Sequence, residues 1–340
     1  MRRLAQLIFA IALLFNPVIA TAQTQSGDFY RGKTIRLMIG AAAGGGFSAY
    51  ALLLSAYLGR HIPGSPAVVI EHMPGGGGIN SINYVANAAP LDGTVMAVAI
   101  PNFFVTPHIE PHAVRFDASK FHFIGRMSDF SRVLVAWHTT GVNSIEDLKT
   151  REITLAATAR RSTTTAGPML MNEILGTKMK IVLGYTGTGP TMIAMESGEV
   201  GSTTVALATL TSLQPSWLRE NKVRVLAGMD FAHVPIDGVP RVRDLISDPK
   251  QRALWDFVAL SAEFGTAMVM APGVPSERVE ILRAAFDAMV KNDEFVAEAK
   301  RRNLDLSPKT GAELAALYRE YGSPPAEIKA AVARIMGVSE

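Results

Sequence analysis

Residues 34–60 read TIRLMIGAAAGGGFSAYALLLSAYLGR, and this stretch carries the pattern that decides the fold. The apolar run at 34–39 starts with a β-branched residue and stops at a glycine, which predicts a short buried strand. A glycine triplet follows at 44–46, and from Phe47 apolar residues recur at helical spacing to about residue 60. The stretch therefore predicts a strand, a glycine-rich loop and a helix in succession.

The next part of the chain repeats this order. Residues 67–71 are strand-like, MPGGGG occupies 73–78, and a helix is expected from Ile79 onward. The dipeptide Asp92-Gly93 predicts a turn before a third strand at 94–100. Two consecutive units of strand, glycine loop and helix imply a parallel sheet with helices on its faces.

The remaining sequence predicts a second α/β domain inserted into the first. Further strands are expected at 121–125, 132–137, 153–157, 180–184, 202–206 and 223–228, and the chain is strand-like again from 257 to 270. Helices are expected from a capping-box pattern at 144–147, from the polar loop 158–165 up to residue 175, at 191–197, at 275–290 and beyond. We expect domain 1 to comprise residues 27–130 plus 262–340 and domain 2 to comprise 131–261, with crossings near 127–132 and 259–265.

The first 22 residues have the pattern of a secretory signal peptide. Arg2 and Arg3 precede an apolar run at 4–15, and Ala20-Thr21-Ala22 forms an A-x-A cleavage site. The run is shorter than the roughly 20 apolar residues that span a bilayer, which disfavours the alternative of a membrane anchor. We expect cleavage after Ala22 and export, in a bacterium to the periplasm. The pattern leaves open whether export follows the Sec or the Tat route.

Composition excludes several classes of function. The chain has 340 residues with 33 Lys+Arg and 30 Asp+Glu, and loss of Arg2 and Arg3 would reduce its net charge from +3 to +1. A charge this small argues against a nucleic-acid-binding protein. With no cysteine there is no disulfide framework, iron–sulfur cluster or thiol nucleophile. An apolar fraction of 48% argues against global disorder.

The two glycine loops are the strongest candidates for a binding site. The first four N–H groups of a helix lack intrahelical partners, and the helix dipole adds positive charge there. Glycine lets a ligand approach that backbone closely. Loops 44–46 and 75–78 place two such helix starts at the carboxyl edge of one sheet. They predict an anion site; the alternative is a pair of tight turns without a ligand.

The same residues support a rival hypothesis. Gly44 to Ala49 matches G-x-G-x-x-A after a strand, and the second strand ends in the acidic Glu71. This is the pattern of a nicotinamide-dinucleotide-binding oxidoreductase. The acid lies 25 residues beyond Gly46, somewhat far for that role, and export from the cytoplasm also argues against a free dinucleotide.

Four segments together resemble the Bug-type solute receptors, the extracytoplasmic binding proteins of tripartite tricarboxylate transporters. They are FYRGKTIRLMIGAAAGGGFSAYALLL, VVIEHMPGGGGINSINYVANAAPLDGT, GYTGTGPTMIAMESGEV and APGVPSERVEILRAAFDAMVKNDEFVAEA, in this order. The resemblance implies a two-lobed type II periplasmic-binding-protein (Venus-flytrap) fold, a small carboxylate in the cleft and no catalysis. It also implies a membrane permease of one small and one large subunit as partner. We expect a monomer with no cofactor, no metal and no nucleic-acid partner; a ligand-sensing subunit of a signalling system has the same fold and stays an alternative.

The resemblance assigns ligand-binding residues to both domains. The domain 1 residues are Ala42, Ala43, Gly44, Gly45, Phe47, Ser48, Gly76, Gly77 and Asn102. The domain 2 residues are Arg160, Arg161, Ser162, Thr163, Thr164, Tyr185, Thr186, Gly187, Thr188 and Val205. Arg160-Arg161 and the apolar Val205 depart from the family pattern. They suggest a charged clamp and a ligand with one acidic end and a less polar body.

Each candidate also has a structural interpretation. Arg160 and Arg161 could be solvated loop residues, and the Ser/Thr run at 162–165 could cap a helix. Tyr185 and Phe47 could pack in a core instead of the cleft. Prolines flank the His108/His112 pair, which disfavours a helical metal site, and no G-x-S-x-G nucleophile elbow is present.

Overall fold

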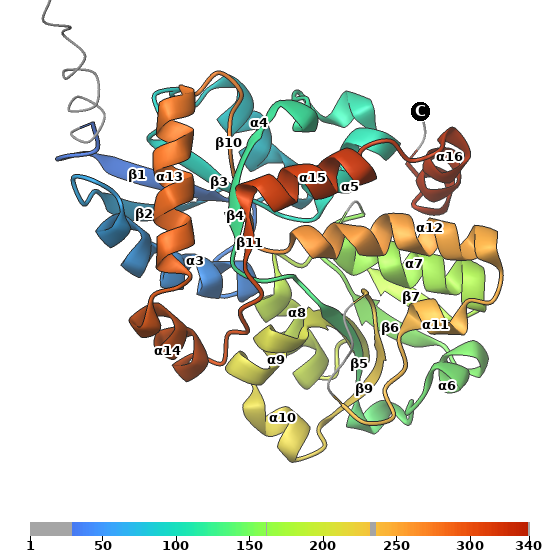
Figure 1. Cartoon of the computed structure of the whole chain (residues 1–340). Helices are drawn as coiled ribbons and strands as arrows, with labels where there is room; N and C mark the ends of the chain where they lie inside the picture. The colour runs from blue at the N-terminus through green and yellow to red at the C-terminus, as the bar shows by residue number, and fades with distance from the viewer. Residues whose placement is uncertain (1–28, 161, 232–235, 339–340) are drawn as a thin grey trace, which may run out of the picture.

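Two β-sheets with helices on their faces organise the chain (Figure 1). The computed structural model describes residues 29–160, 162–231 and 236–338, so the expected signal peptide lies outside the described residues. The first sheet has the strand order β11-β4-β10-β3-β1-β2. Its strands are β1 (Thr34–Ile39), β2 (Ala67–His72), β3 (Val95–Ala99), β4 (His122–Arg126), β10 (Ala267–Met270) and β11 (Lys309–Thr310).

Strand direction in this sheet is mixed. β1 is parallel to β2 and β3, as the two consecutive units predict. β10 is antiparallel to both β3 and β4, and β11 is antiparallel to β4. The prediction of parallel strands is therefore confirmed for β1, β2 and β3, and β4 runs in the same direction, whereas β10 and β11 run in the opposite direction. Apolar periodicity indicates that a strand is buried, but it carries no information about direction.

The second sheet has the order β7-β6-β8-β5-β9. Its strands are β5 (Arg132–Trp137), β6 (Ile153–Ala156), β7 (Met179–Val182), β8 (Ser202–Ala206) and β9 (Val223–Gly228). β6 is parallel to β7 and β8, whereas β5 is antiparallel to β8 and β9. Each sheet thus combines a parallel βαβ unit with strands of opposite direction, which are β10 and β11 in the first sheet and β5 in the second.

Helices form the outer layers. Around the first sheet lie α3 (Gly46–Tyr57), α4 (Ile79–Asn87), α5 (Asn102–Ile109), α13 (Ser276–Met289), α14 (Asp293–Arg301) and α15 (Gly311–Tyr321). Around the second lie α6 (Ile145–Thr150), α7 (Thr163–Leu175), α8 (Thr188–Glu196), α9 (Leu207–Leu213), α10 (Pro215–Arg219), α11 (Val242–Leu245) and α12 (Pro249–Ala259). The C-terminal helix is α16 (Ala326–Ile335).

Several helix ends follow local sequence signals. Ser144 and Asp147 form the expected capping box at the start of α6, and Gly176 ends α7 with a φ of 70°. At α3, by contrast, Gly45 is the N-cap, and Ser48 does not cap the helix. Within the described residues no helix has the length and apolar character needed to cross a membrane.

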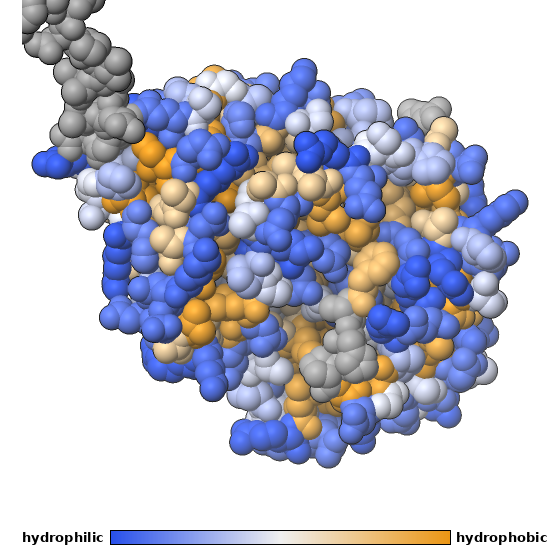
Figure 2. Space-filling model, viewed as in Figure 1, coloured by the Kyte–Doolittle hydropathy of each residue, from blue (hydrophilic) through white to orange (hydrophobic). Residues whose placement is uncertain are grey.

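Three apolar cores hold the layers together. One lies between the first sheet and α3 and α13, and another between the second sheet and α8 to α10. The third core includes Phe104 of α5, Leu134 of β5 and Trp255 of α12, so it extends through both lobes. On the face in Figure 2, hydrophilic residues predominate and apolar residues form small groups among them. The third core therefore joins the two lobes by shared apolar packing.

The chain passes between the sheets twice, after β4 and before β10. Residues 257–264 finish α12 and form the 3-10 helix η6 (Leu260–Phe264), so the strand expected from 257 starts only at Ala267. A short apolar run that is buried on all sides is compatible with either a helix or a strand, which explains the error. Gly265 has a φ of 46°, and a Cβ there would collide with the Ser128 carbonyl. The two crossings therefore touch each other where only glycine fits.

We keep the division into residues 27–130 plus 262–340 and 131–261 as a proposal, and the membership of strands in the two sheets supports it. The C-terminal helix adds a feature that this division does not describe. α16 packs against α5 of the first lobe and against α7 and α12. Arg334 of α16 also pairs with Glu173 of α7 at 3.1 Å. α16 therefore bridges the two lobes.

Candidate functional site

A cavity of about 370 Å³ lies between the two lobes, beyond the carboxyl ends of β1, β2 and β3. Its first-lobe lining consists of Gly40, Ala41, Ala42, Gly45, Gly46, Phe47, Pro74, Gly75, Gly76, Gly77, Gly78, Ile100, Pro101 and Asn102. Phe130 lies in the crossing segment. The second-lobe lining consists of Arg132, Thr158, Ala159, Ser162, Thr163, Thr164, Tyr185, Thr186, Gly187, Thr188, Thr204, Val205 and Ala206. The volume suits a small organic ligand.

The first glycine loop presents the N-terminus of α3 to this cavity. Gly45 provides no side-chain cap, and the N–H groups of Gly46, Phe47 and Ser48 have no acceptor among the described residues. Nδ1 of His72 donates to the Ala41 carbonyl at 2.8 Å, and the buried Ser48 hydroxyl donates to the Ala42 carbonyl at 3.3 Å. These bonds give the two loop carbonyls side-chain donors, so the N–H groups at the helix start are left as donors for an anion.

The second loop needs glycine for its backbone conformation. Gly75, Gly76, Gly77 and Gly78 have φ values of 124°, 58°, 63° and 93°. A Cβ on Gly78 would collide with the Ile100 side chain. No described residue accepts a bond from the N–H of Gly76 or Gly77. The loop therefore adds backbone donors beside those of α3.

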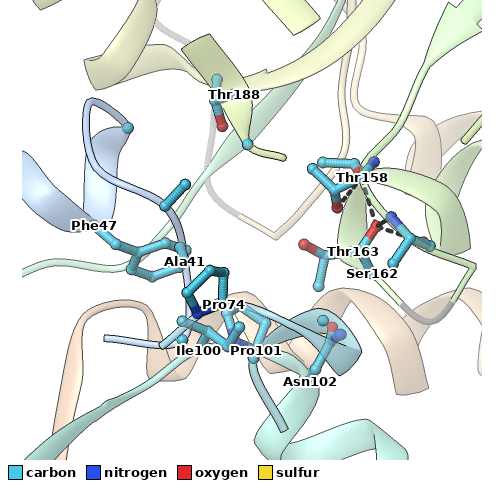
Figure 3. A pocket seen from close by; sticks show the side chains of 18 of the residues that line it. Ala41, Phe47, Pro74, Ile100, Pro101, Asn102, Thr158, Ser162, Thr163 and Thr188 are labelled. Carbon is cyan, nitrogen blue, oxygen red and sulfur yellow. Dashed lines mark hydrogen bonds between the residues drawn. The ribbon is translucent and has the colours of Figure 1, made fainter. Parts of the chain in front are cut away.

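The opposite wall, from the second lobe, is rich in hydroxyl groups. Ser162 and Thr164 share a hydrogen bond of 2.6 Å, and Thr164 also accepts one from the N–H of Thr158. Figure 3 shows Thr163 and Thr188 directed into the space that Phe47 faces from the first lobe. One wall thus offers apolar side chains and backbone N–H groups, and the other offers hydroxyls.

Three aromatic rings border the site. Phe47 stacks on Phe130 with ring centroids 4.2 Å apart. The Tyr185 hydroxyl donates to Glu199 at 2.6 Å, and this bond raises the pKa of Tyr185 to about 12. The ring of Tyr185 therefore lines the cavity, and its hydroxyl is hydrogen-bonded to Glu199.

Most of the residues expected from the sequence lie together around this cavity. These are Ala42, Gly45, Phe47, Gly76, Gly77, Asn102, Ser162, Thr163, Thr164, Tyr185, Thr186, Gly187, Thr188 and Val205. Ala43 and Gly44 lie outside it, exposed on the outer turn of the loop, and Ser48 is buried beneath the loop. Ligand contact by any of these residues stays a prediction.

The structure does not bring Arg160 to the cavity. Arg160 is exposed and lines a separate, shallower recess with residues of α7 and Ile335 of α16. A Cβ on Gly337 would lie 3.1 Å from its Nη1 atom, so the guanidinium is directed toward the C-terminal segment. Arg161 lies outside the described residues. The expected charged clamp is thus not assembled by Arg160.

Sequence reasoning missed several lining residues, of which Arg132 is the most informative. The missed residues are Gly40, Ala41, Pro74, Ile100, Phe130, Arg132 and Thr204. Arg132 is 3% exposed and pairs with the equally buried Asp230, with Nη2 to Oδ1 at 2.5 Å. Its Nη1 donates to the Thr163 carbonyl at 2.6 Å, at the start of α7. A charged residue opening an otherwise apolar strand was a signal that could have drawn attention to it.

The acid required by the dinucleotide hypothesis is already occupied. Both carboxylate oxygens of Glu71 accept bonds from Arg36, each at 2.6 Å, and Arg36 also lowers the pKa of Glu71. A ribose would have to compete with this bidentate pair. No group of three or more His, Asp or Glu residues in the described part of the chain could hold a metal ion.

Comparison with known proteins agrees with this architecture. The structure is similar to the periplasmic binding protein BugD (TM-score 0.72, 19% identity, 91% of this chain and 99% of that one). It is also similar to MatC from Rhodopseudomonas palustris with bound malate (TM-score 0.68, 19% identity, 89% and 99%). At these identities the likeness concerns the fold, and it confirms the expected two-lobed periplasmic-binding-protein fold.

Two sequence comparisons point the same way. The UPF0065 protein in the TAR-I ttuE-ttuC' intergenic region of Agrobacterium vitis is 25% identical over 196 residues, and the match spans 56% of that protein's length. The family model described as tripartite tricarboxylate transporter family receptor matches residues 60–308, which is more than half of the chain. The protein therefore belongs to the receptor family of the tripartite tricarboxylate transporters.

Proposed function

We propose that this protein is a periplasmic receptor that captures a small carboxylate between its lobes and delivers it to a tripartite tricarboxylate transporter. One observation carries the proposal: two glycine-rich helix starts present unpaired backbone N–H groups to a cavity of about 370 Å³ between the lobes. Such donors favour an anion. Membership of the receptor family and the malate bound in the structurally similar MatC support a carboxylate as that anion.

Further parts of the proposal concern the protein's surroundings. The chain is exported by the signal peptide at 1–22, acts as a monomer and transfers its ligand to a permease of one small and one large membrane subunit. It catalyses no reaction, since binding and lobe closure are sufficient for delivery. Uptake of labelled ligand into vesicles that contain the permease separates this role from that of a sensor subunit.

The test is binding by protein that has been unfolded and refolded to remove any carried-over ligand. Isothermal titration calorimetry with mono- and dicarboxylates of three to eight carbons should identify at least one ligand in the micromolar range or tighter. The methyl ester of each carboxylate is the matched control and should not bind, because it lacks the charge that the helix starts attract.

Two results would contradict the proposal. One is the absence of binding by every carboxylate, and the other is equal binding by an acid and its ester.

The Arg160→Ala variant should keep the wild-type affinity, because Arg160 lies outside the cavity lining.

A further inference from the structure

Thr204 places an unpaired hydroxyl in the wall of the cavity. Its side chain is 1% exposed, and among the described residues its Oγ1 atom has no hydrogen-bond partner. The neighbouring hydroxyls of β8 are paired, since Thr203 donates to the Ala156 carbonyl and Ser202 to the Thr154 carbonyl. A buried hydroxyl without a partner costs free energy, so a ligand atom that bonds to it gains affinity.

Arg132 lies beside this hydroxyl. Thr204 is paired with Leu134 across β8 and β5, and Arg132 precedes Leu134 by two residues, so all three side chains share one face of the sheet. Arg132 lines the cavity as well. Thr204 and Arg132 are therefore diagonal neighbours in the same wall.

The charge of Arg132 is already balanced. Its Nε and Nη2 atoms donate to the two carboxylate oxygens of Asp230, and Nη1 donates to the Thr163 carbonyl. A guanidinium has five N–H bonds, so two remain for other acceptors. Because Arg132 is the one charged residue in the described lining, this corner offers hydrogen bonds without an uncompensated positive charge.

We infer that the corner formed by Thr204 and Arg132 binds an uncharged hydrogen-bonding group at the far end of the ligand, such as a hydroxyl or an amide carbonyl. The inference rests on the proposed function, in which the glycine loops hold the carboxylate. A second carboxylate at this corner would be buried near Asp230 with no free cation to pair with it. The receptor therefore selects a monocarboxylate with a neutral polar end over a dicarboxylate of equal length.

The experiment is calorimetry with ligands matched in length. Each set, of four, five or six carbons, contains the plain monocarboxylate, the ω-hydroxy acid, the half-amide of the dicarboxylate and the dicarboxylate itself. For the best-fitting length we expect the hydroxy acid or the half-amide to bind about threefold to tenfold more tightly than both other acids.

Variants of Thr204 test the assignment to this corner. Thr204→Val keeps the shape but removes the hydroxyl, and it should abolish most of the preference for the hydroxy acid over the plain acid. Thr204→Ser keeps the hydroxyl and should keep the preference. Arg160→Ala is the control and should match the wild type. If a variant folds poorly, the order of affinities of the wild-type protein for the four ligands still tests the inference.

The outcomes separate the two proposals. If the receptor binds these acids with equal affinity, or binds the dicarboxylate most tightly, the inference is overturned and the proposed function still stands. A preference unchanged in Thr204→Val would overturn it too. If no acid binds at all, both fail.

Discussion

The buried ion pair of Arg132 and Asp230 shows how single residues shape the site. Both side chains are at most 3% exposed, so each has lost its hydration. The loss is offset by two bonds between the groups, and Asp230 also accepts from the Arg132 N–H at 2.7 Å. The pair links the start of β5 to the segment after β9, and through the Thr163 carbonyl it fixes the start of α7 at the cavity.

Removing the charge of one partner should lower the free energy of unfolding. Asp230→Asn leaves the Arg132 charge buried without a counter-ion, and we expect it to lower the free energy of unfolding by about 3–5 kcal/mol. Urea denaturation measures the loss. Asp244→Asn is the control, because its pair with Arg241 is partly exposed and should contribute less than about 1 kcal/mol. Equal losses in the two variants would contradict this account.

At the scale of elements, the contact between α5 and α16 makes stability depend on pH. His108 of α5 stacks edge-on against Phe257 of α12, with ring centroids 6.0 Å apart. Burial lowers the pKa of His108, and Lys329 of α16 lowers it further. Burial also lowers the pKa of His122 in β4. Both rings are therefore neutral in the folded protein at a pH where the unfolded chain begins to protonate them.

Acidification should consequently destabilise the fold. A histidine with a lowered folded pKa contributes no penalty above the unfolded pKa of about 6.5, and stability is lost as pH falls below that value. We expect the melting temperature to fall between pH 6.5 and pH 5. His108→Gln should show a shallower fall than the wild type, measured by thermal unfolding in buffers of equal ionic strength. A slope identical to that of the wild type would exclude a role for His108.

At the scale of the whole molecule, the two lobes meet around the mouth of the cavity. A Cβ on Gly46 of α3 would collide with the Thr209 hydroxyl of α9, and a Cβ on Gly187 would lie 3.8 Å from Ala42. The Phe47–Phe130 stack lies at the same junction. The contacts at Gly46 and Gly187 join one lobe to the other, so we expect them to be lost when the lobes move apart.

Closure can be blocked by a single methyl group. Gly46→Ala should weaken ligand binding by about tenfold, because its methyl would overlap Thr209 in the arrangement of the lobes that encloses the cavity. Thr209→Ala removes the overlapping hydroxyl and should restore much of the affinity in the double variant. Gly189→Ala is the matched control, since Gly189 lies outside the cavity lining and a Cβ there would meet only the Gly44 carbonyl, at an ordinary contact distance of 3.8 Å. Calorimetry on the four proteins tests this, and an unaltered affinity in Gly46→Ala would refute it.

The candidate site was predictable where its chemistry is local. The loops at 44–46 and 75–78 follow apolar strands and precede helices, and most of their glycines adopt positive φ values that the local turn requires. Most of the expected lining residues on these loops and on 158–165 and 185–189 do surround one cavity. Arg160 shows the limit of such predictions. It lies in a loop that lines the cavity, but its side chain faces another recess, because side-chain direction depends on the local turn and on α16.

The sequence by itself determined the α/β order of the elements, the glycine loops and the family, since periodicity and backbone requirements act over short distances. Only the tertiary structure decided the reversed direction of β5, β10 and β11, the bridging position of α16 and the wall formed by Arg132 and Thr204. Arg132 lies 98 residues from Asp230, and Thr204 reaches the same wall through the pairing of β8 with β5. The pairing of strands and charges far apart in the chain results from packing, which no local pattern encodes.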